Sequence, residues 1–199
     1  MIFIRYESFQ AYLKLYPITS AILGLNLLLF ILSQIVGLPL LEFGAFIQMP
    51  ADPYGLIEPW RYVTSQFLHL SWQHILFNCF SILVFAPPLE RLLGSLRYLV
   101  FYLLCGIVGN LFSALWGPAW LVSAGASGAI YGVFGAYLNL ALIRKDMLDA
   151  ASRKTVYTIL ILGIVFSFMT VTRVNILAHV GGLAAGFALY APFAARVRR

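Results

Sequence analysis

The sequence predicts an all-α, polytopic membrane protein built as a bundle of six transmembrane helices. Of its 199 residues, 62% are hydrophobic and only 10% are charged, and the mean hydropathy is +0.91. A soluble domain of this size does not need so apolar a composition. Backbone polar groups in lipid must be paired within the chain, so only helices and closed barrels span a membrane. The apolar stretches are rich in glycine and do not alternate with polar residues, which favours helices.

Six apolar stretches follow one another along the chain and predict the six spans. They cover residues 17–36, 72–88, 98–116, 125–143, 155–171 and 175–193. The bundle therefore occupies residues 17–195, ahead of a short basic cytoplasmic tail at 196–199. The first stretch is too long for the apolar region of a signal peptide, so we expect it to stay in the membrane.

The segment before the first span predicts a short helix with one apolar face. An apolar residue recurs there every three or four positions: Ile2, Tyr6, Phe9, Leu13 and Tyr16. Such a stripe is typical of a helix lying under the cytoplasmic lipid headgroups, or of one packed against the bundle. The connection at 37–71 is long and contains many apolar residues, so we expect it to lie partly in the membrane interface. Loops of this length often carry function.

The basic residues predict the orientation of the chain. With the N-terminus inside, cytoplasmic segments hold eleven Lys and Arg residues and outer segments hold two, Arg61 and Arg173. This asymmetry places both termini in the cytoplasm. The net charge of +6 is then explained by topology and by contact with membrane lipids, and nucleic-acid binding is a poor interpretation. We expect the cell membrane of a prokaryote. The oligomeric state stays open.

Three polar residues of catalytic type fall at one predicted depth. His74, Ser127 and His179 each lie 17 residues before an arginine that marks the cytoplasmic end of a segment (Arg91, Arg144 and Arg196). At about 1.5 Å per residue, each lies roughly 25 Å from that side. Ionisable groups inside a membrane are costly and usually functional. A hydroxyl and two imidazoles in one shallow plane favour bond-cleaving chemistry.

Small residues predict that the fourth and sixth spans pack closely. They recur every fourth position, at Ala124, Gly128, Gly132 and Ala136 on one side and at Ala178, Gly182 and Gly186 on the other. His179 shares a face with Gly182 and Gly186, so this packing would carry it to Ser127. Taken alone, such spacing usually means only helix packing.

A serine nucleophile needs a base, and His179 is the candidate base for Ser127. No acidic residue falls within a predicted span to orient the base. We therefore expect a Ser–His dyad, with Tyr131 packed against the imidazole one turn below Ser127. His74 and Asn78, one turn apart, and the backbone N–H of Ser127 are candidate oxyanion donors. Asn78 could instead be a hydrogen bond between helices.

A metal centre is the obvious rival for a chain with three histidines. His69 and His74 are five residues apart, about 140° around a helix. No carboxylate or cysteine completes a recognisable ligand set, so we expect no metal and no cofactor. Cys79 and Cys105 fall inside predicted spans, where we interpret them as small packing residues.

These motifs together resemble the rhomboid family of intramembrane serine proteases. The matching pieces are Gly125-Ala126-Ser127-Gly128 with Tyr131, Ala178-His179-Val180-Gly181-Gly182, His69-x4-His74-x3-Asn78, and Trp60-Arg61. The resemblance covers the six-helix core and implies Ser127 as nucleophile and His179 as base. It also implies His74, Asn78 and the Ser127 amide around the oxyanion, Gly125 shaping that strand, and His69, Trp60 and Arg61 as loop supports.

The implied activity is hydrolysis of peptide bonds in or beside the transmembrane helices of protein substrates, without a cofactor. Two other functions remain as alternatives. A small transporter would use the polar residues as a path, but it needs them through the full membrane thickness, whereas the strongest cluster lies in the outer third. A non-catalytic protein that binds and escorts membrane helices would use the same cleft.

Overall fold

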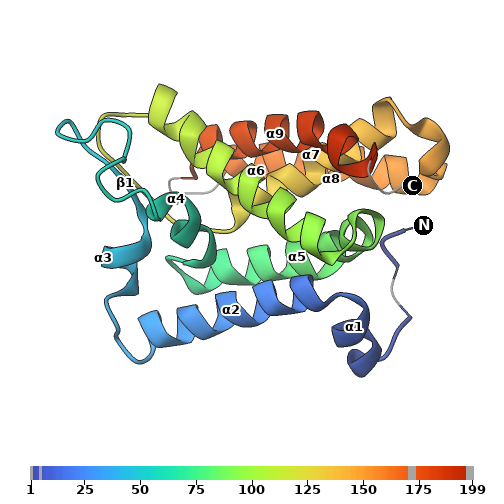
Figure 1. The fold of residues 1–199 in the computed structure, drawn as a ribbon, viewed down its shortest axis with the longest axis horizontal. Coiled ribbons are helices and arrows are strands. Elements are labelled where there is room, and N and C mark those ends of the chain that lie inside the picture. The colour runs from blue at the N-terminus through green and yellow to red at the C-terminus, as the bar shows by residue number, and fades with distance from the viewer. Residues whose placement is uncertain (1, 5, 170–173, 196–199) are drawn as a thin grey trace.

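The computed structural model describes residues 2–4, 6–169 and 174–195. The described part contains nine α-helices and two short strands (Figure 1). The helices are α1 (Phe9–Leu15), α2 (Pro17–Gln34), α3 (Leu40–Gly44), α4 (Arg61–Thr64), α5 (Trp72–Leu93), α6 (Ser95–Trp116), α7 (Ser127–Leu142), α8 (Ala150–Met169) and α9 (Ile176–Ala195). The strands β1 (Phe46–Gln48) and β2 (Leu121–Ser123) pair antiparallel, and 3₁₀ turns cover Ser65–Phe67 and Lys145–Met147. The basic tail predicted at 196–199 lies outside the described residues.

Four of the described helices are long and apolar enough to cross a membrane: α2, α5, α6 and α9. α7 is apolar but has 16 residues, and α8 has 20. The prediction of a helical, multi-pass membrane protein is confirmed. A helix as short as α7 is compatible with a membrane protein if it begins below the membrane surface. The loop before such a helix is tolerated at that depth where it is buried in the protein.

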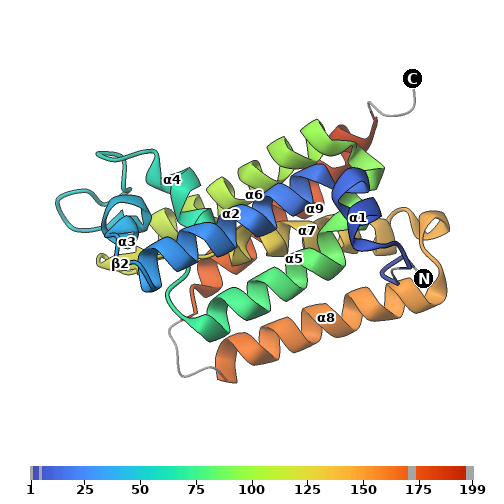
Figure 2. The same cartoon turned by 90° about the horizontal axis from the view of Figure 1, so that it is seen from below.

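The long helices run alongside one another, with α7 at the centre. Of the 16 residues of α7, 13 are buried, and the helix packs against α5, α6, α8 and α9. Figure 2 shows α8 along the edge of the bundle, where α7 is the helix that it contacts most. The short elements α3, α4, β1 and β2 gather at one end, which we name the loop end (Figure 1). The opposite end, beside α1, is named the terminal end.

Glycines let α7 and α9 touch backbone to backbone. A Cβ placed on Gly182 would collide with the carbonyl oxygen of Gly128, and one on Gly186 with that of Gly132. Gly135 faces the backbone of α9 at Leu183 in the same way. Ala124 is not part of this face, contrary to prediction. It precedes α7 and packs with Ala45 and Leu68 of the loop end, because Gly125 turns the chain with a φ of +144°.

The fifth helix, α5, is longer than its predicted span, which ended at the two prolines 87 and 88. A proline in a helix leaves a carbonyl without its usual partner. Here the hydroxyl of Tyr12 donates to the carbonyl of Leu83 at 3.2 Å, and α5 continues to Leu93. Glu90 therefore lies inside a helix and is 1% exposed. It accepts hydrogen bonds from Thr19 at 2.6 Å and Ser95 at 2.7 Å, which offset its burial.

The N-terminal helix is shorter than predicted. α1 begins only at Phe9 because Ser8 caps it, its hydroxyl accepting from the N–H of Ala11 at 3.3 Å. Phe3, which is not part of the predicted stripe, packs in the bundle core, with its ring 5.3 Å from that of Phe85. Tyr6, a member of the predicted stripe, lies outside α1 and is 90% exposed. The prediction of one helix with a single apolar face from residue 2 to residue 16 is therefore wrong.

The connection between α2 and α5 is a braced, folded loop. Arg61 is 5% exposed, and its guanidinium donates to the carbonyls of Ala45 at 2.8 Å and Glu42 at 2.7 Å. Its Nε donates to the carboxylate of Glu58 at 2.7 Å. The indole N–H of Trp60 donates to the carbonyl of Phe43 at 3.1 Å. β1 of this loop pairs with β2 before α7, which ties the loop to the segment that leads to Ser127.

Candidate active site

Ser127 and His179 meet at the loop end of the bundle. Ser127 is the first residue of α7 and His179 the fourth of α9. Their side chains are joined by a hydrogen bond of 2.9 Å between Oγ and Nε2. His179 is 8% exposed and Ser127 is half-buried. The glycine contacts of Gly182 with Gly128 lie one turn or less from this pair, so the close helix approach sets its distance.

The imidazole of His179 is held flat against an aromatic ring. Tyr131, one turn below Ser127 on α7, stacks on it with ring centroids 4.1 Å apart and planes 11° from parallel. The acidic residues of the loop end, Glu42, Asp52 and Glu58, lie in the first connection. This stacking restrains the plane of the His179 imidazole.

Gly125 brings the second candidate cluster against the loop before Ser127. A Cβ on Gly125 would lie 2.5 Å from Cε1 and 2.6 Å from Nε2 of His74, and 3.7 Å from Nδ2 of Asn78. Only glycine fits there, and its positive φ favours glycine as well. Asn78 is 5% exposed, and its Nδ2 has no hydrogen-bond partner among the described residues. A buried donor without a partner is costly, so this amide is available to a ligand.

The start of α7 adds backbone donors to the same place. The first N–H groups of a helix have no partner within it, and Ser127 is the first residue of α7. Ser127, His74 and Asn78 therefore surround Gly125 with donors of three kinds. The three side chains belong to the first two turns of α5 and α7.

The first connection holds Gly125 in place. The N–H of Gly125 donates to the carbonyl of Ser65 at 2.8 Å, and the Ser65 hydroxyl accepts from Asn110 of α6 at 2.9 Å. His69 is 1% exposed, with its ring 5.1 Å from that of His74. Burial, with a smaller contribution from His74, lowers the pKa of His69 to about 3. His69 is therefore neutral at pH 7 and supports His74 as a packed ring.

Not every predicted site residue joins this cluster. The side chains of Trp60 and Arg61 bond within the first connection, through the hydrogen bonds described above. Asn175, by contrast, was not singled out by the sequence. Its side chain binds Ser113 of α6, Ser123 of β2 and the N–H of Ala178. An Asn directly before an apolar helix is a capping signal that could have identified it.

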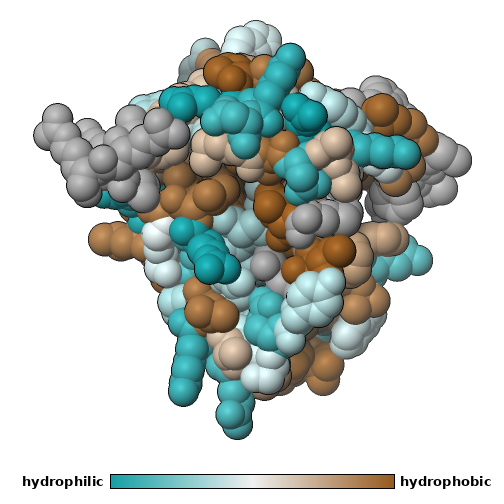
Figure 3. All heavy atoms as spheres, turned by 90° about the vertical axis from the view of Figure 1, so that its right-hand side faces the viewer, coloured by the Kyte–Doolittle hydropathy of each residue, from teal (hydrophilic) through white to brown (hydrophobic). Residues whose placement is uncertain are grey.

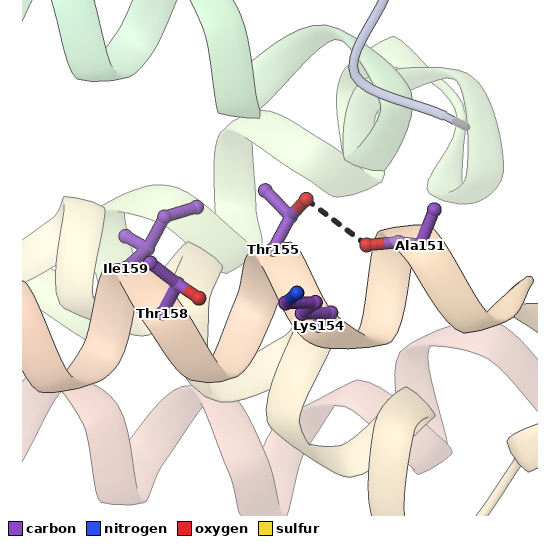
Figure 4. A pocket seen from close by; sticks show the side chains of 5 residues that line it. All are labelled: Ala151, Lys154, Thr155, Thr158 and Ile159. Carbon is purple, nitrogen blue, oxygen red and sulfur yellow. Dashed lines mark hydrogen bonds between the residues drawn. The ribbon is translucent and has the colours of Figure 1, made fainter.

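One pocket among the described residues lies away from this cluster. It has a volume of about 310 Å³ and is lined by one face of α8: Ala151, Lys154, Thr155, Thr158 and Ile159 (Figure 4). The Thr155 hydroxyl is directed back to the carbonyl of Ala151 at 3.0 Å. This pocket lies along the N-terminal half of α8, and none of the candidate catalytic residues lines it. The candidate catalytic residues lie instead at the starts of α5, α7 and α9.

Comparison with known proteins decides the family. Residues 57–196 match the model of the Rhomboid domain. The Bacillus subtilis (strain 168) protein named "Putative rhomboid protease YdcA" is 36% identical over 187 residues, which cover 94% of each chain. This chain belongs to the rhomboid family.

Two further rhomboid relatives match a smaller share of their own length. The rhomboid protease GluP of Bacillus subtilis is 34% identical over 172 residues, 85% of this chain and 33% of GluP. The Rhomboid-like protease 3 of Toxoplasma gondii is 35% identical over 141 residues, 70% of this chain and 53% of that protein. The family prediction made from the motifs is confirmed, and the matched Rhomboid domain contains every residue of the cluster described above.

Proposed function

We propose that this rhomboid is an intramembrane serine endopeptidase that uses Ser127 as nucleophile and His179 as base. The observation that carries the proposal is the 2.9 Å hydrogen bond between Ser127 Oγ and His179 Nε2. It joins the starts of α7 and α9 in a chain whose relatives are named rhomboid proteases. A nucleophile and a base within hydrogen-bond reach are the signature of covalent catalysis.

In the first step, Ser127 Oγ attacks the carbonyl carbon of the scissile peptide bond while its proton passes to Nε2 of His179. Nε2 must therefore be the unprotonated nitrogen of a neutral imidazole. The imidazolium then donates this proton to the leaving amine, and an acyl-enzyme ester remains on Ser127. Water, with His179 again as base, hydrolyses the ester and releases the carboxylate product. The stacked ring of Tyr131 keeps the imidazole plane fixed through both steps.

The negative charge that develops on the substrate oxygen needs donors. Nδ2 of Asn78, the ring of His74 and the N–H of Ser127 surround the space beside Gly125. Gly125, Gly128 and Gly182 act as spacers, because a side chain on Gly125 or Gly182 would close the gap. His69, Trp60 and Arg61 support the loop that carries Gly125.

The proposed topology is six spans, with both ends of the chain in the cytoplasm and the loop end outside. The cationic side chains gather at the terminal end: Arg91, Arg97, Arg144, Lys145, Arg153 and Lys154. Figure 3 faces this end and shows hydrophilic side chains spread across it. The rule that cationic loops stay inside then sets the orientation and places these residues against anionic lipid in a prokaryotic cell membrane. Residues 17–195 form the protease domain, and 1–16 lie at the interface.

The substrates we propose are membrane proteins cut in or next to a transmembrane helix. A helical carbonyl is engaged in its own hydrogen bond, so a substrate must unwind locally before attack. Small or helix-weakening residues near the cut make this easier. Water reaches Ser127 from the loop end, where the side chain is half-buried rather than enclosed. The chemistry needs no metal or cofactor.

A fluorophosphonate that labels activated serines tests the proposal. We expect it to label Ser127 in the purified protein, identified by mass spectrometry of the modified peptide. Ser127→Ala and His179→Ala should each abolish labelling and cleavage of a model transmembrane substrate, and the double variant should be no worse. The matched control is Ser20→Ala, because Ser20 is a membrane-helix serine whose hydroxyl binds its own backbone at Tyr16.

The two alternatives predict different results in the same experiment. An escort protein would bind the substrate without labelling and without cleavage. If the protein were a transporter, Ser127→Ala and His179→Ala would impair transport, and neither the wild type nor any variant would cleave the substrate. Cleavage that persists in Ser127→Ala would contradict the assignment of the nucleophile.

A further inference from the structure

Asn175 joins three elements at the loop end through one amide. It precedes the first residue of α9, and its Oδ1 accepts from the N–H of Ala178 at 3.1 Å. The same oxygen accepts from the hydroxyl of Ser113, in α6, at 2.9 Å. Its Nδ2 donates to the hydroxyl of Ser123, at the end of β2, at 3.0 Å. The three hydrogen bonds of this amide therefore reach three different elements: α9, α6 and β2.

The contacts of Asn175 with Ala178 and Ser123 lie close in the chain to the proposed base and nucleophile. The N–H of His179 donates to the carbonyl of Asn175 at 3.2 Å, so the base lies one helical turn from the amide. Ser123 lies four residues before Ser127, and the chain between them includes Gly125. The base and the nucleophile are therefore linked twice: directly by their own hydrogen bond, and indirectly through Asn175 and Ser123.

The third contact fixes this link to the scaffold. Ser113 is fully buried on α6, where α6 and α9 approach closely at Gly109 and Ala178. Capping the helix requires only the bond to the N–H of Ala178. The bonds to Ser113 and Ser123 are not needed for a cap, and they connect the start of α9 with the strand that leads to the nucleophile.

We propose that Asn175 is a positioning residue that sets the distance between His179 and Ser127 by bonding β2, α6 and α9 together. The inference rests on the proposed function of the dyad. Asn175 touches neither the reacting atoms nor the oxyanion donors, and it acts through the placement of the two residues. A misplacement of about 1 Å in a catalytic group costs about 100-fold in rate, so a bond that keeps the pair in register has a large effect on turnover.

Asn175→Ser separates the capping role from the bridging role. Serine caps a helix about as well as asparagine, but its shorter side chain does not reach both Ser113 and Ser123. We expect kcat for a model transmembrane substrate to fall about 10- to 100-fold, with KM unchanged, and fluorophosphonate labelling of Ser127 to slow in proportion. Ser123→Ala should have a smaller effect of the same kind, and adding it to Asn175→Ser should cost nothing more, because both remove the same bond.

Asn139→Ala is the matched control. Asn139 is an asparagine of α7, 4% exposed, whose Nδ2 donates across to α9 at the carbonyl of Phe187 at 2.8 Å. It lies 12 residues from Ser127 toward the terminal end. We expect its loss to lower the thermal unfolding midpoint and leave kcat unchanged.

Three results would overturn the inference. The first is wild-type kcat in Asn175→Ser, which would reduce Asn175 to a cap. The second is a loss of kcat in Asn139→Ala equal to that in Asn175→Ser, which would mean that activity follows stability alone. The third is full additivity of Asn175→Ser with Ser123→Ala. Labelling of wild-type Ser127 in the same samples separates these results from failure of the proposed function, in which wild type would not label.

Discussion

Gly182→Ala should separate the dyad without removing a reacting atom. The new Cβ would collide with the carbonyl oxygen of Gly128 and lie 2.9 Å from its carbonyl carbon, whereas ordinary contacts begin at 3.4 Å. The helices must therefore part by at least 0.5 Å (3.4 minus 2.9). Added to the 2.9 Å between Ser127 and His179, this gives 3.4 Å or more. That exceeds the roughly 3.2 Å limit for a working nucleophile–base bond.

We expect this variant to lose about 10- to 100-fold in kcat and about 1–3 kcal/mol in free energy of unfolding, the usual cost of overpacking. Cleavage kinetics in liposomes and thermal unfolding of the purified protein measure the two effects. The control is Gly24→Ala in α2, where nothing lies within 4 Å of the added atom. Relief from a mid-helix glycine should stabilise that variant by about 0.5–1 kcal/mol. Wild-type kcat and stability in Gly182→Ala would refute the packing argument.

Three further predictions concern the donors and the loop. Asn78→Ala should lower kcat by about 100-fold or less with little change in KM, because one donor is lost and others remain; unchanged kcat with lower stability would return Asn78 to a structural role. Arg61→Ala should lower the free energy of unfolding by about 1–3 kcal/mol for each buried carbonyl that loses its donor, measured by thermal unfolding. His69 has a folded pKa of about 3, below its unfolded value of about 6.5. The unfolded chain therefore binds more protons between these values, and stability should fall as pH drops below about 6.5. His69→Gln should remove that part of the pH dependence.

The sequence was sufficient for the features that depend on residue type and spacing. Hydropathy predicted an apolar stretch at each of the long helices α2, α5, α6, α7, α8 and α9 of the described residues, since apolar stretches in lipid have few other solutions. Glycine spacing indicated the contact of α7 with α9, and the structure places Gly128, Gly132, Gly182 and Gly186 in it. The catalytic roles of the residues that meet there stay predictions until the variants above are measured.

What the sequence could not supply depends on partners distant in the chain. The predicted span ended before Glu90, because a buried carboxylate needs donors. Those donors, the hydroxyls of Thr19 and Ser95, belong to other elements and are not apparent from the local sequence. The strands β1 and β2 have three residues each, which is too short for a period of two to be visible. Asn175 carried a local capping signal, but its bonds to Ser113 and Ser123 span 62 and 52 residues.

The order of elements has a consequence for biogenesis. The proposed nucleophile begins α7, whereas the proposed base belongs to α9, 52 residues later along the chain. During synthesis the first helices enter the membrane before the base has been translated. The bond between Ser127 and His179 forms only when α9 has been inserted and packed on the glycines of α7. Under the proposed mechanism, a partly made chain carries Ser127 without its base, so the nascent protein cannot cut neighbouring membrane proteins, or itself, before its fold is complete.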